Sequence, residues 1–162
     1  MDIKDQNNLN EKFHELNDRH NNIYQFVMLY NDYIVSTHDY GIGQVVSMTE
    51  AHILTYIEEN PGTTITNLAK YWNKTKGALS QTVSKLVDKG LVYRHKTENN
   101  AKTVLLFVTE DGLKLSKAHK LYDTIDIAKT LDDLLKECTI EEIESFYKVI
   151  EVYIKLLKNG FK

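Results

Sequence analysis

Residues 64–108 read TITNLAKYWNKTKGALSQTVSKLVDKGLVYRHKTENNAKTVLLFV, and this stretch decides the fold. Its apolar residues recur twice at helical spacing and then crowd into two short runs rich in Val, Leu, Tyr and Phe. The pattern predicts two helices and then two strands, at Ile65–Trp72, Thr75–Lys89, Leu91–Lys96 and Lys102–Val108. The expected local structure is therefore a helix–turn–helix followed by a β-hairpin.

The same stretch is strongly basic. Between Thr64 and Lys102 there are eight Lys or Arg residues and two acidic residues, a net charge of +6. The whole chain has 20 basic and 23 acidic residues, so 12 basic and 21 acidic residues lie elsewhere. A basic segment inside an acidic protein predicts that one face meets a polyanion.

The second predicted helix has two unlike faces. Leu79, Val83 and Leu86 share one side, whereas small and polar residues occupy the other. Such a face suits the major groove of DNA, where glutamine pairs well with adenine and flanking lysines neutralise phosphates. A merely solvated helix face is the alternative, but the basic hairpin that follows favours DNA. The expected contacts are Thr75, Lys76, Gly77, Ser80, Gln81, Ser84 and Lys85.

Further contacts with the DNA backbone are expected on either side of this helix. Thr64, Thr66 and Lys74 lie near helix starts, where free amides and a cation suit a phosphate. The polar hairpin suits a wing that follows the backbone or enters the minor groove. The expected wing contacts are Arg94, Lys96, Asn99, Asn100 and Lys102.

The N-terminal segment predicts a long helix with one apolar seam. Between Leu9 and Val35, bulky residues recur in alternating steps of four and three. They are Leu9, Phe13, Leu16, His20, Ile23, Val27, Tyr30 and Ile34. The helix either packs on its own core or contributes to a subunit interface, and the length of the seam favours the interface.

Capping patterns divide the rest of the chain. Ser47–Glu50 and Thr139–Glu142 each predict a capping box, and Thr109 begins another helix. We expect a mainly α fold with a small β-hairpin, in which a winged helix–turn–helix core is flanked by long N- and C-terminal dimerisation helices. The expected divisions are an N-terminal dimerisation helix and linker at 1–46, the DNA-binding domain at 47–108 and C-terminal dimerisation helices at 109–162.

Composition narrows the class of protein. The 162 residues are 42% hydrophobic and include a single cysteine, Cys138, which fits a reducing cytoplasm and to which we assign a structural role. No signal peptide or membrane-spanning run is visible, so neither export nor a membrane partner is expected. The chain also lacks a glycine-rich phosphate loop, a nucleophile elbow and a metalloprotease pattern, so we expect no enzyme.

From Met48 to Leu115 the chain resembles the winged-helix core of MarR-type transcription regulators. The matching elements are Leu68-Ala69, Thr75-Lys76, Lys89-Gly90-Leu91, Arg94 and Val108-Thr109-Glu110-Asp111-Gly112. The resemblance implies a homodimer whose recognition helices read a pseudo-palindromic operator one helical turn apart. It also implies a repressor released by a small effector, often a phenolic or other anionic aromatic, bound between the winged helix and the dimerisation helices. No cofactor is required.

The wing departs from the family pattern. Relatives carry Asp and Arg where this chain has Asn100 and Lys102. The Asp–Arg pair stiffens the wing and sends the arginine into the minor groove. Lys lacks the planar fork of Arg, so we expect a weaker wing contact here. The main alternative function is a winged-helix adaptor that binds proteins and not DNA.

Three residues also resemble ligands of the family's zinc-sensing branch. His52 and His119 match histidines of that branch, and Asp123 lies where a further ligand occurs one turn later. These groups suit zinc if a fourth ligand, such as His38, completes the set. The alternative is a buried histidine that only makes hydrogen bonds, and zinc is the less favoured interpretation.

Overall fold

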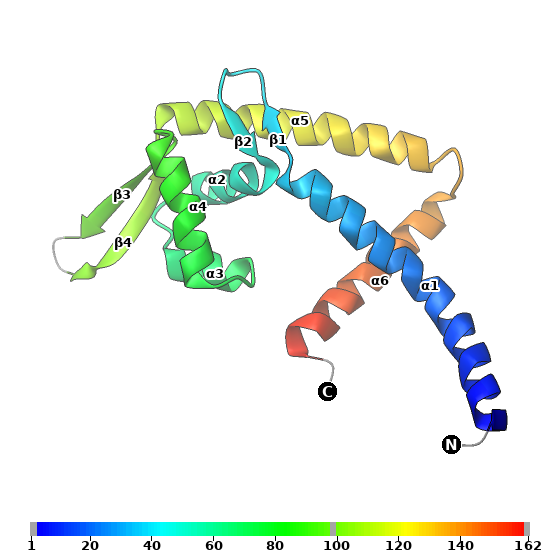
Figure 1. The fold of residues 1–162 in the computed structure, drawn as a ribbon. Helices are drawn as coiled ribbons and strands as arrows, with labels where there is room; N and C mark the ends of the chain where they lie inside the picture. The colour runs from blue at the N-terminus through cyan, green and yellow to red at the C-terminus, as the bar shows by residue number, and fades with distance from the viewer. Residues whose placement is uncertain (1–2, 98–99, 161–162) are drawn as a thin grey trace.

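A computed structural model describes residues 3–97 and 100–160, and helices make up most of this part of the chain (Figure 1). The elements in order are α1 (Ile3–Val35), β1 (Thr37–Asp39), β2 (Val45–Ser47), α2 (Met48–Glu59), α3 (Ile65–Tyr71), α4 (Lys76–Asp88), β3 (Val92–Thr97), β4 (Asn100–Val108), α5 (Glu110–Leu134) and α6 (Ile140–Asn159). None of the helices in the described ranges has the length and apolar character that crossing a bilayer requires. The expected fold class is confirmed.

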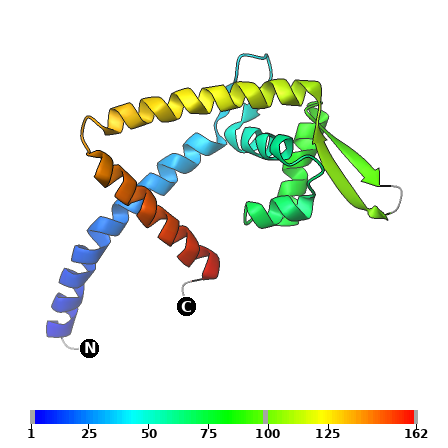
Figure 2. The ribbon, with the colours of Figure 1, turned by 180° about the vertical axis from the view of Figure 1, so that it is seen from behind.

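Helix α1 extends from the rest of the chain as a long arm, and α6 crosses beside it (Figures 1 and 2). The two helices touch where the rings of Phe26 and Phe146 meet edge to face, with centroids 6.3 Å apart. The predicted seam residues of α1 remain largely uncovered in the single chain, for example Leu16 at 66% and Val27 at 55% exposure. The long helix is confirmed, and the described residues of the chain leave most of its apolar seam uncovered.

A small hairpin, β1–β2, joins α1 to α2. Its strands pair Thr37 with Ser47 and Asp39 with Val45, and the Asp39 carboxylate accepts hydrogen bonds from the amides of Gly41 and Gly43. The sequence predicted only a helix break here. Strands of three residues are too short to show a period of two, so the hairpin left no recognisable pattern.

Helices α2, α3 and α4 and the first half of α5 enclose one apolar core. Both predicted capping boxes are present, at Ser47–Glu50 and Thr139–Glu142, and Thr64 caps α3 as expected. The largest fully buried apolar side chains are Leu54, Ile57, Leu68, Leu86, Leu91, Leu106 and Leu115. Together these elements form a lobe from which α1 and the far end of α5 project (Figure 1).

The predicted wing is the β3–β4 hairpin. The register runs from Val92 opposite Val108 to Lys96 opposite Val104, with an irregularity at Lys96/Thr97. Strand β3 ends at Thr97, one residue later than predicted, and strand β4 begins at Asn100, two residues earlier than the predicted Lys102. An isolated bridge between Thr63 and Leu106 ties the start of α3 to the wing.

The junction between wing and α5 explains why a threonine and a glycine occur there. Thr109 caps α5 by accepting a hydrogen bond from the amide of Gly112, and its hydroxyl donates to the carbonyl of Gly90 at 2.7 Å. A Cβ atom at Gly112 would collide with the carbonyl oxygen of Leu91. This close approach holds α5 against the end of α4.

Candidate nucleic-acid interface and histidine–aspartate cluster

Helix α4 presents its predicted polar face to solvent. Thr75 caps the helix by accepting a hydrogen bond from the amide of Ala78 at 3.2 Å. Leu79, Val83 and Leu86 are buried, as the periodicity predicted. On the opposite side Lys76, Gly77, Gln81 and Lys85 are exposed, whereas Ser80 and Ser84 are half-buried. The structure thus brings all seven predicted recognition-helix residues onto the start and outer side of one helix.

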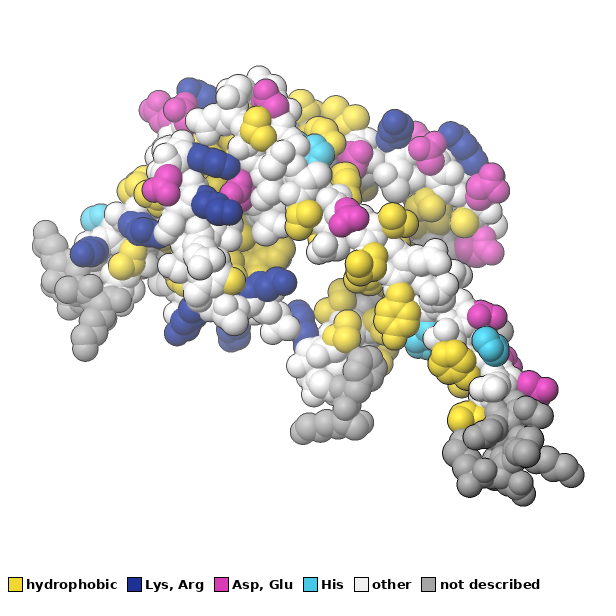
Figure 3. Space-filling model, in the orientation of Figure 1, with side chains coloured by type: hydrophobic (Ala, Val, Ile, Leu, Met, Phe, Trp, Pro, Cys, Tyr) yellow, Lys and Arg dark blue, Asp and Glu magenta, His cyan; other side chains and the backbone are white. Residues whose placement is uncertain are grey.

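Basic side chains surround this face. Lys70 and Lys74, from α3 and the turn after it, are exposed beside α4. Figure 3 shows Lys and Arg gathered over α3 and α4, and several acidic side chains toward the far end of α5. Thr66 is exposed, whereas the hydroxyl of Thr64 accepts a hydrogen bond from the Asn67 amide at 3.2 Å. A phosphate at this helix start would accept hydrogen bonds from free backbone amides, and the Thr64 hydroxyl would still have its own proton to donate.

Arg94 and Ser84 contact each other in the free chain. The Arg94 guanidinium, on β3, donates a hydrogen bond of 2.8 Å to Ser84 Oγ on α4. The sequence assigned Arg94 to the wing and Ser84 to base reading, and it gave no sign that the two would meet. Arg94 consequently lies beside the recognition helix, at the base of the wing.

The tip of the wing is described only in part. Lys96 is exposed. Asn99 lies outside the described residues, and for Asn100 and Lys102 only the backbone is described, as part of β4. The expectation of a weaker wing contact stays a prediction.

One cation of the basic stretch, Lys89, forms an ion pair within the protein. Lys89 Nζ lies 2.8 Å from the carboxylate of Glu50 and 3.0 Å from the carbonyl oxygen of Val45. Glu50 is 7% exposed, and the same carboxylate oxygen accepts the capping-box bond from the Ser47 amide. Lys89 therefore joins the end of α4 to the start of α2, which reduces the charge left for a polyanion.

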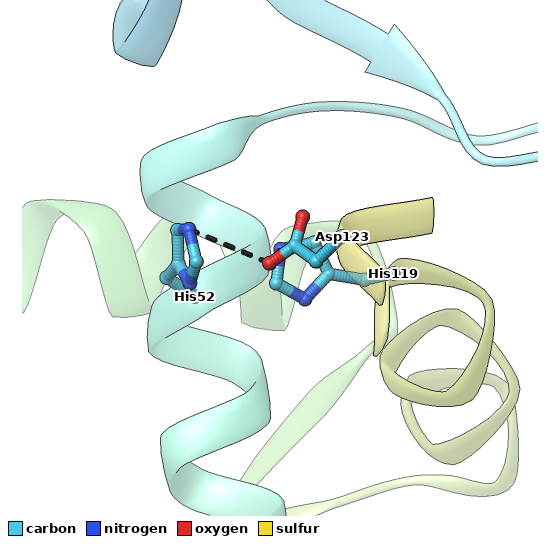
Figure 4. A group of neighbouring side chains, drawn as sticks. All are labelled: His52, His119 and Asp123. Atoms are coloured by element: carbon cyan, nitrogen blue, oxygen red, sulfur yellow. Dashed lines mark ion pairs between the residues drawn. The ribbon is translucent and has the colours of Figure 1, made fainter. Parts of the chain in front are cut away.

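His52, His119 and Asp123 meet between α2 and α5, and we call these three residues the His–Asp cluster (Figure 4). Asp123 Oδ2 lies 3.8 Å from His52 Nε2 and 3.3 Å from His119 Nε2. The two imidazole rings are edge to face with centroids 4.6 Å apart. The sequence predicted this grouping from a resemblance, and the structure brings the three ligand atoms within 4.8 Å of one another.

Burial and hydrogen bonding prepare His119 as a ligand. Burial lowers the pKa of His119, His52 and Lys120 lower it further, and Asp123 opposes them, so the ring is neutral at neutral pH. His119 Nδ1 shares a hydrogen bond of 3.1 Å with Thr55 Oγ1, whereas Nε2 has no hydrogen-bond partner among the described residues. Neutral imidazole nitrogen and carboxylate oxygen are the donors that zinc accepts, so the cluster fits this ion.

The suggested fourth ligand, His38, does not join the cluster. His38 Nε2 lies 2.8 Å from Ser36 Oγ, and its ring packs against Tyr33, Tyr40 and Tyr122. Among the described residues, only His52, His119 and Asp123 bring potential metal-ligand atoms together in this way. The expectation for His38 was wrong because β1 turns its imidazole toward Ser36.

An aromatic cleft of about 750 Å³ lies between α3 and the C-terminal end of α6. Tyr56, Tyr71 and Trp72 supply its aromatic walls, and Lys70 and Lys158 supply cations. The rings of Tyr56 and Tyr71 are 4.4 Å apart. The sequence pointed to the region between lobe and terminal helices but did not single out these residues.

Cys138, in the turn between α5 and α6, is exposed and takes no part in a core, so burial does not support its assigned structural role.

Known proteins resemble the chain in sequence. The sequence profile of the MarR family matches residues 46–102. An uncharacterized HTH-type transcriptional regulator of Bacillus subtilis (strain 168), YhjH, is 32% identical over 84 residues. Those residues are 52% of this chain and 48% of YhjH, so the chain spans about half the length of that relative.

Solved structures share the fold over most of its length. A mutant MarR from E. coli in complex with operator DNA matches with a TM-score of 0.67 and 21% identity, over 87% of this chain and 96% of that chain. Lactococcus lactis ZitR, a zinc-responsive MarR family member, matches with a TM-score of 0.62 and 19% identity, over 91% and 99% of the two chains. At these identities the likeness concerns the fold alone.

Proposed function

We propose that the chain is a transcription regulator of the MarR family that binds double-stranded DNA in the cytoplasm, a proposal supported by the match of that family's profile to residues 46–102. The observation that supports this most is the outer face of α4, where Ser80 and Gln81 stand between exposed lysines. In the major groove, Gln81 would hydrogen-bond to a base edge, and Lys76 and Lys85 would neutralise phosphates. The proposed regulator thus recognises a DNA sequence and is not an enzyme.

A homodimer completes this proposal. The exposed apolar residues of α1 and α6 need a partner, and a second copy of the chain supplies the same helices in a self-complementary arrangement. Two α4 helices would then meet two half-sites of a pseudo-palindromic operator, one helical turn apart. The basic patch over α3 and α4 (Figure 3) would face the DNA in both protomers.

The aromatic cleft supports the proposal that a small effector releases the protein from DNA. Its three aromatic rings and two lysines suit an anionic aromatic molecule, which would lie between the lobe and α6. Occupancy would change the angle between the lobe and the terminal helices, and so the spacing of the two α4 helices. Trp72 is the only tryptophan, so its fluorescence should report the binding of a probe such as salicylate.

The test of DNA binding begins with selection of bound duplexes from a random pool by the full-length protein. The affinity for the selected duplex should fall steeply with salt, and Lys76→Ala should reduce the slope of log K against log salt by about 1.8, because each of the two protomers loses one phosphate contact. Gln81→Ala should weaken the selected duplex more than a random one. An adaptor that binds proteins would retain no duplex even at low salt, and that result would refute the proposal.

The His–Asp cluster supports a second candidate, a regulator whose DNA affinity responds to zinc. The fold shared with ZitR is compatible with this, and the three converging ligand atoms are the specific observation. A chelator should then change the affinity for the selected duplex, and His52→Ala combined with His119→Ala should abolish the change. A chelator effect that persists in the double variant would exclude this site.

A further inference from the structure

The β1–β2 hairpin covers the His–Asp cluster with one tyrosine. Tyr40 follows β1 directly and is 9% exposed. Its ring packs edge to face on His119 and on Tyr122, with centroids 5.3 Å apart in both pairs. A residue of the connection between α1 and α2 is thereby held against the same part of α5 that carries the cluster.

Tyr40 and His119 share an unusual property. Neither the Tyr40 hydroxyl nor His119 Nε2 has a hydrogen-bond partner among the described residues, although both atoms are buried. Buried polar atoms in folded proteins are nearly always paired. Two buried polar atoms that make no hydrogen bond, on rings in direct contact and with the Asp123 carboxylate 3.3 Å from His119 Nε2, indicate a site that suits a polar ligand.

We propose that Tyr40 is the fourth contact of the His–Asp cluster: its hydroxyl donates a hydrogen bond to a water molecule that completes the coordination of a metal ion held by His52, His119 and Asp123. The inference rests on the second candidate function, the response to zinc. Three protein ligands leave one position of a tetrahedral ion open, and that position accepts water. The Tyr40 hydroxyl is a buried donor without a partner among the described residues, and its ring packs on His119, one of the three ligands.

A phenol hydroxyl has one proton to donate, and the buried Tyr40 hydroxyl has no hydrogen-bond partner among the described residues. Its ring packs on His119, so the hydroxyl is assigned as a hydrogen-bond donor beside the cluster. Tyr40 is thus a positioning residue that acts on the ion through the water.

This contact would link the metal site to the terminal arm. The hairpin connects α1 to α2, and the amide of Met48 donates to the Ser36 carbonyl at its base. When a metal ion occupies the site, the contact through Tyr40 would hold the β1–β2 hairpin against α5. The angle between α1 and the lobe, and with it the spacing of two α4 helices in a dimer, would then depend on the occupant of the cluster.

The test compares Tyr40→Phe with Tyr122→Phe in the full-length protein. Zinc affinity is measured by competition with a chromophoric chelator, and the ligand field is read from the visible absorption of bound cobalt(II). Loss of an outer hydrogen bond should weaken zinc binding by about 10–100-fold in Tyr40→Phe, because such partners typically contribute that much. The cobalt spectrum should change as well. Tyr122→Phe removes a neighbouring hydroxyl from the same aromatic group and should leave affinity and spectrum unaltered.

Unfolding of the metal-free proteins separates the metal contact from a packing effect. Tyr40→Phe keeps the ring and removes an unpaired hydroxyl, so its thermal midpoint should not fall. Zinc affinity within twofold of the wild type, or an equal loss in Tyr122→Phe, would overturn the role of Tyr40. A wild-type protein that binds no zinc would overturn both this inference and the zinc response, whereas DNA binding is judged separately by the duplex selection.

Discussion

Gly112 is constrained by the backbone that it touches. A Cβ there would meet the Leu91 carbonyl oxygen, a rigid neighbour, and not a flexible side chain. Gly112→Ala should therefore lower the free energy of unfolding by about 1–3 kcal/mol, the usual cost of overpacking. Urea titration measures the change. Gly77→Ala is the matched control, because only Thr75 Oγ1 at 4.0 Å is near and alanine favours the helix. Equal stability of the two variants would contradict the close-contact explanation.

His119 makes stability depend on pH. Because burial lowers its pKa below the ordinary 6.5, the unfolded chain binds a proton that the folded chain does not. Its contribution to stability is thus complete above pH 6.5 and is lost as the pH falls below that value. Between about pH 7.5 and 5.5, the unfolding free energy of the metal-free protein should fall more steeply for the wild type than for His119→Gln. His14→Gln, at an exposed site on α1, should behave as the wild type. Parallel profiles for wild type and His119→Gln would show that His119 is not the group responsible.

At the level of elements, the Glu50–Lys89 pair holds the recognition helix in place. It joins the end of α4 to the start of α2, and Glu50 is buried. Lys89→Ala would leave this carboxylate without its cation and should cost about 1–3 kcal/mol of stability in denaturant titrations. Lys114→Ala is the control, since Lys114 pairs with Asp111 where both side chains are more than 60% exposed. Such surface pairs contribute about 0–1 kcal/mol. A loss in Lys89→Ala no larger than in Lys114→Ala would refute the positioning role.

Local features of the helices could be predicted from the sequence, whereas contacts between distant segments could not. Caps and helices were predictable because Ser47, Thr64 and Thr139 act on amides only three residues away. The recognition face of α4 was predictable for the same reason, since a helical period is local. Contacts between distant segments were not: Lys89 with Glu50, Arg94 with Ser84 and Tyr40 with His119 depend on tertiary packing. The His–Asp cluster was predicted only through family resemblance, and its expected fourth member, His38, was wrong.

At the scale of the whole molecule, we predict that the terminal helices form the dimer interface. Val27, on the α1 seam, and Val45, on the β1–β2 hairpin, are both 55% exposed, which makes them a matched pair. If α1 forms the dimer interface, Val27→Glu should shift the sedimentation mass toward the monomer and reduce affinity for the selected duplex at least tenfold, because burying an unpaired charge is costly. Val45→Glu should keep the dimer. A dimer that survives Val27→Glu unchanged would place the interface elsewhere.

The exposed turn between α5 and α6 offers a direct way to observe regulation. Cys138 is the chain's single cysteine, and it lies there, far along α5 from the lobe (Figure 1). A maleimide dye would thus attach at one defined point on each protomer without touching α4 or the His–Asp cluster. Energy transfer from Trp72, or between two dyes in a dimer, would then convert the angle between lobe and terminal helices into an optical signal that can be followed as effector, zinc or operator is added.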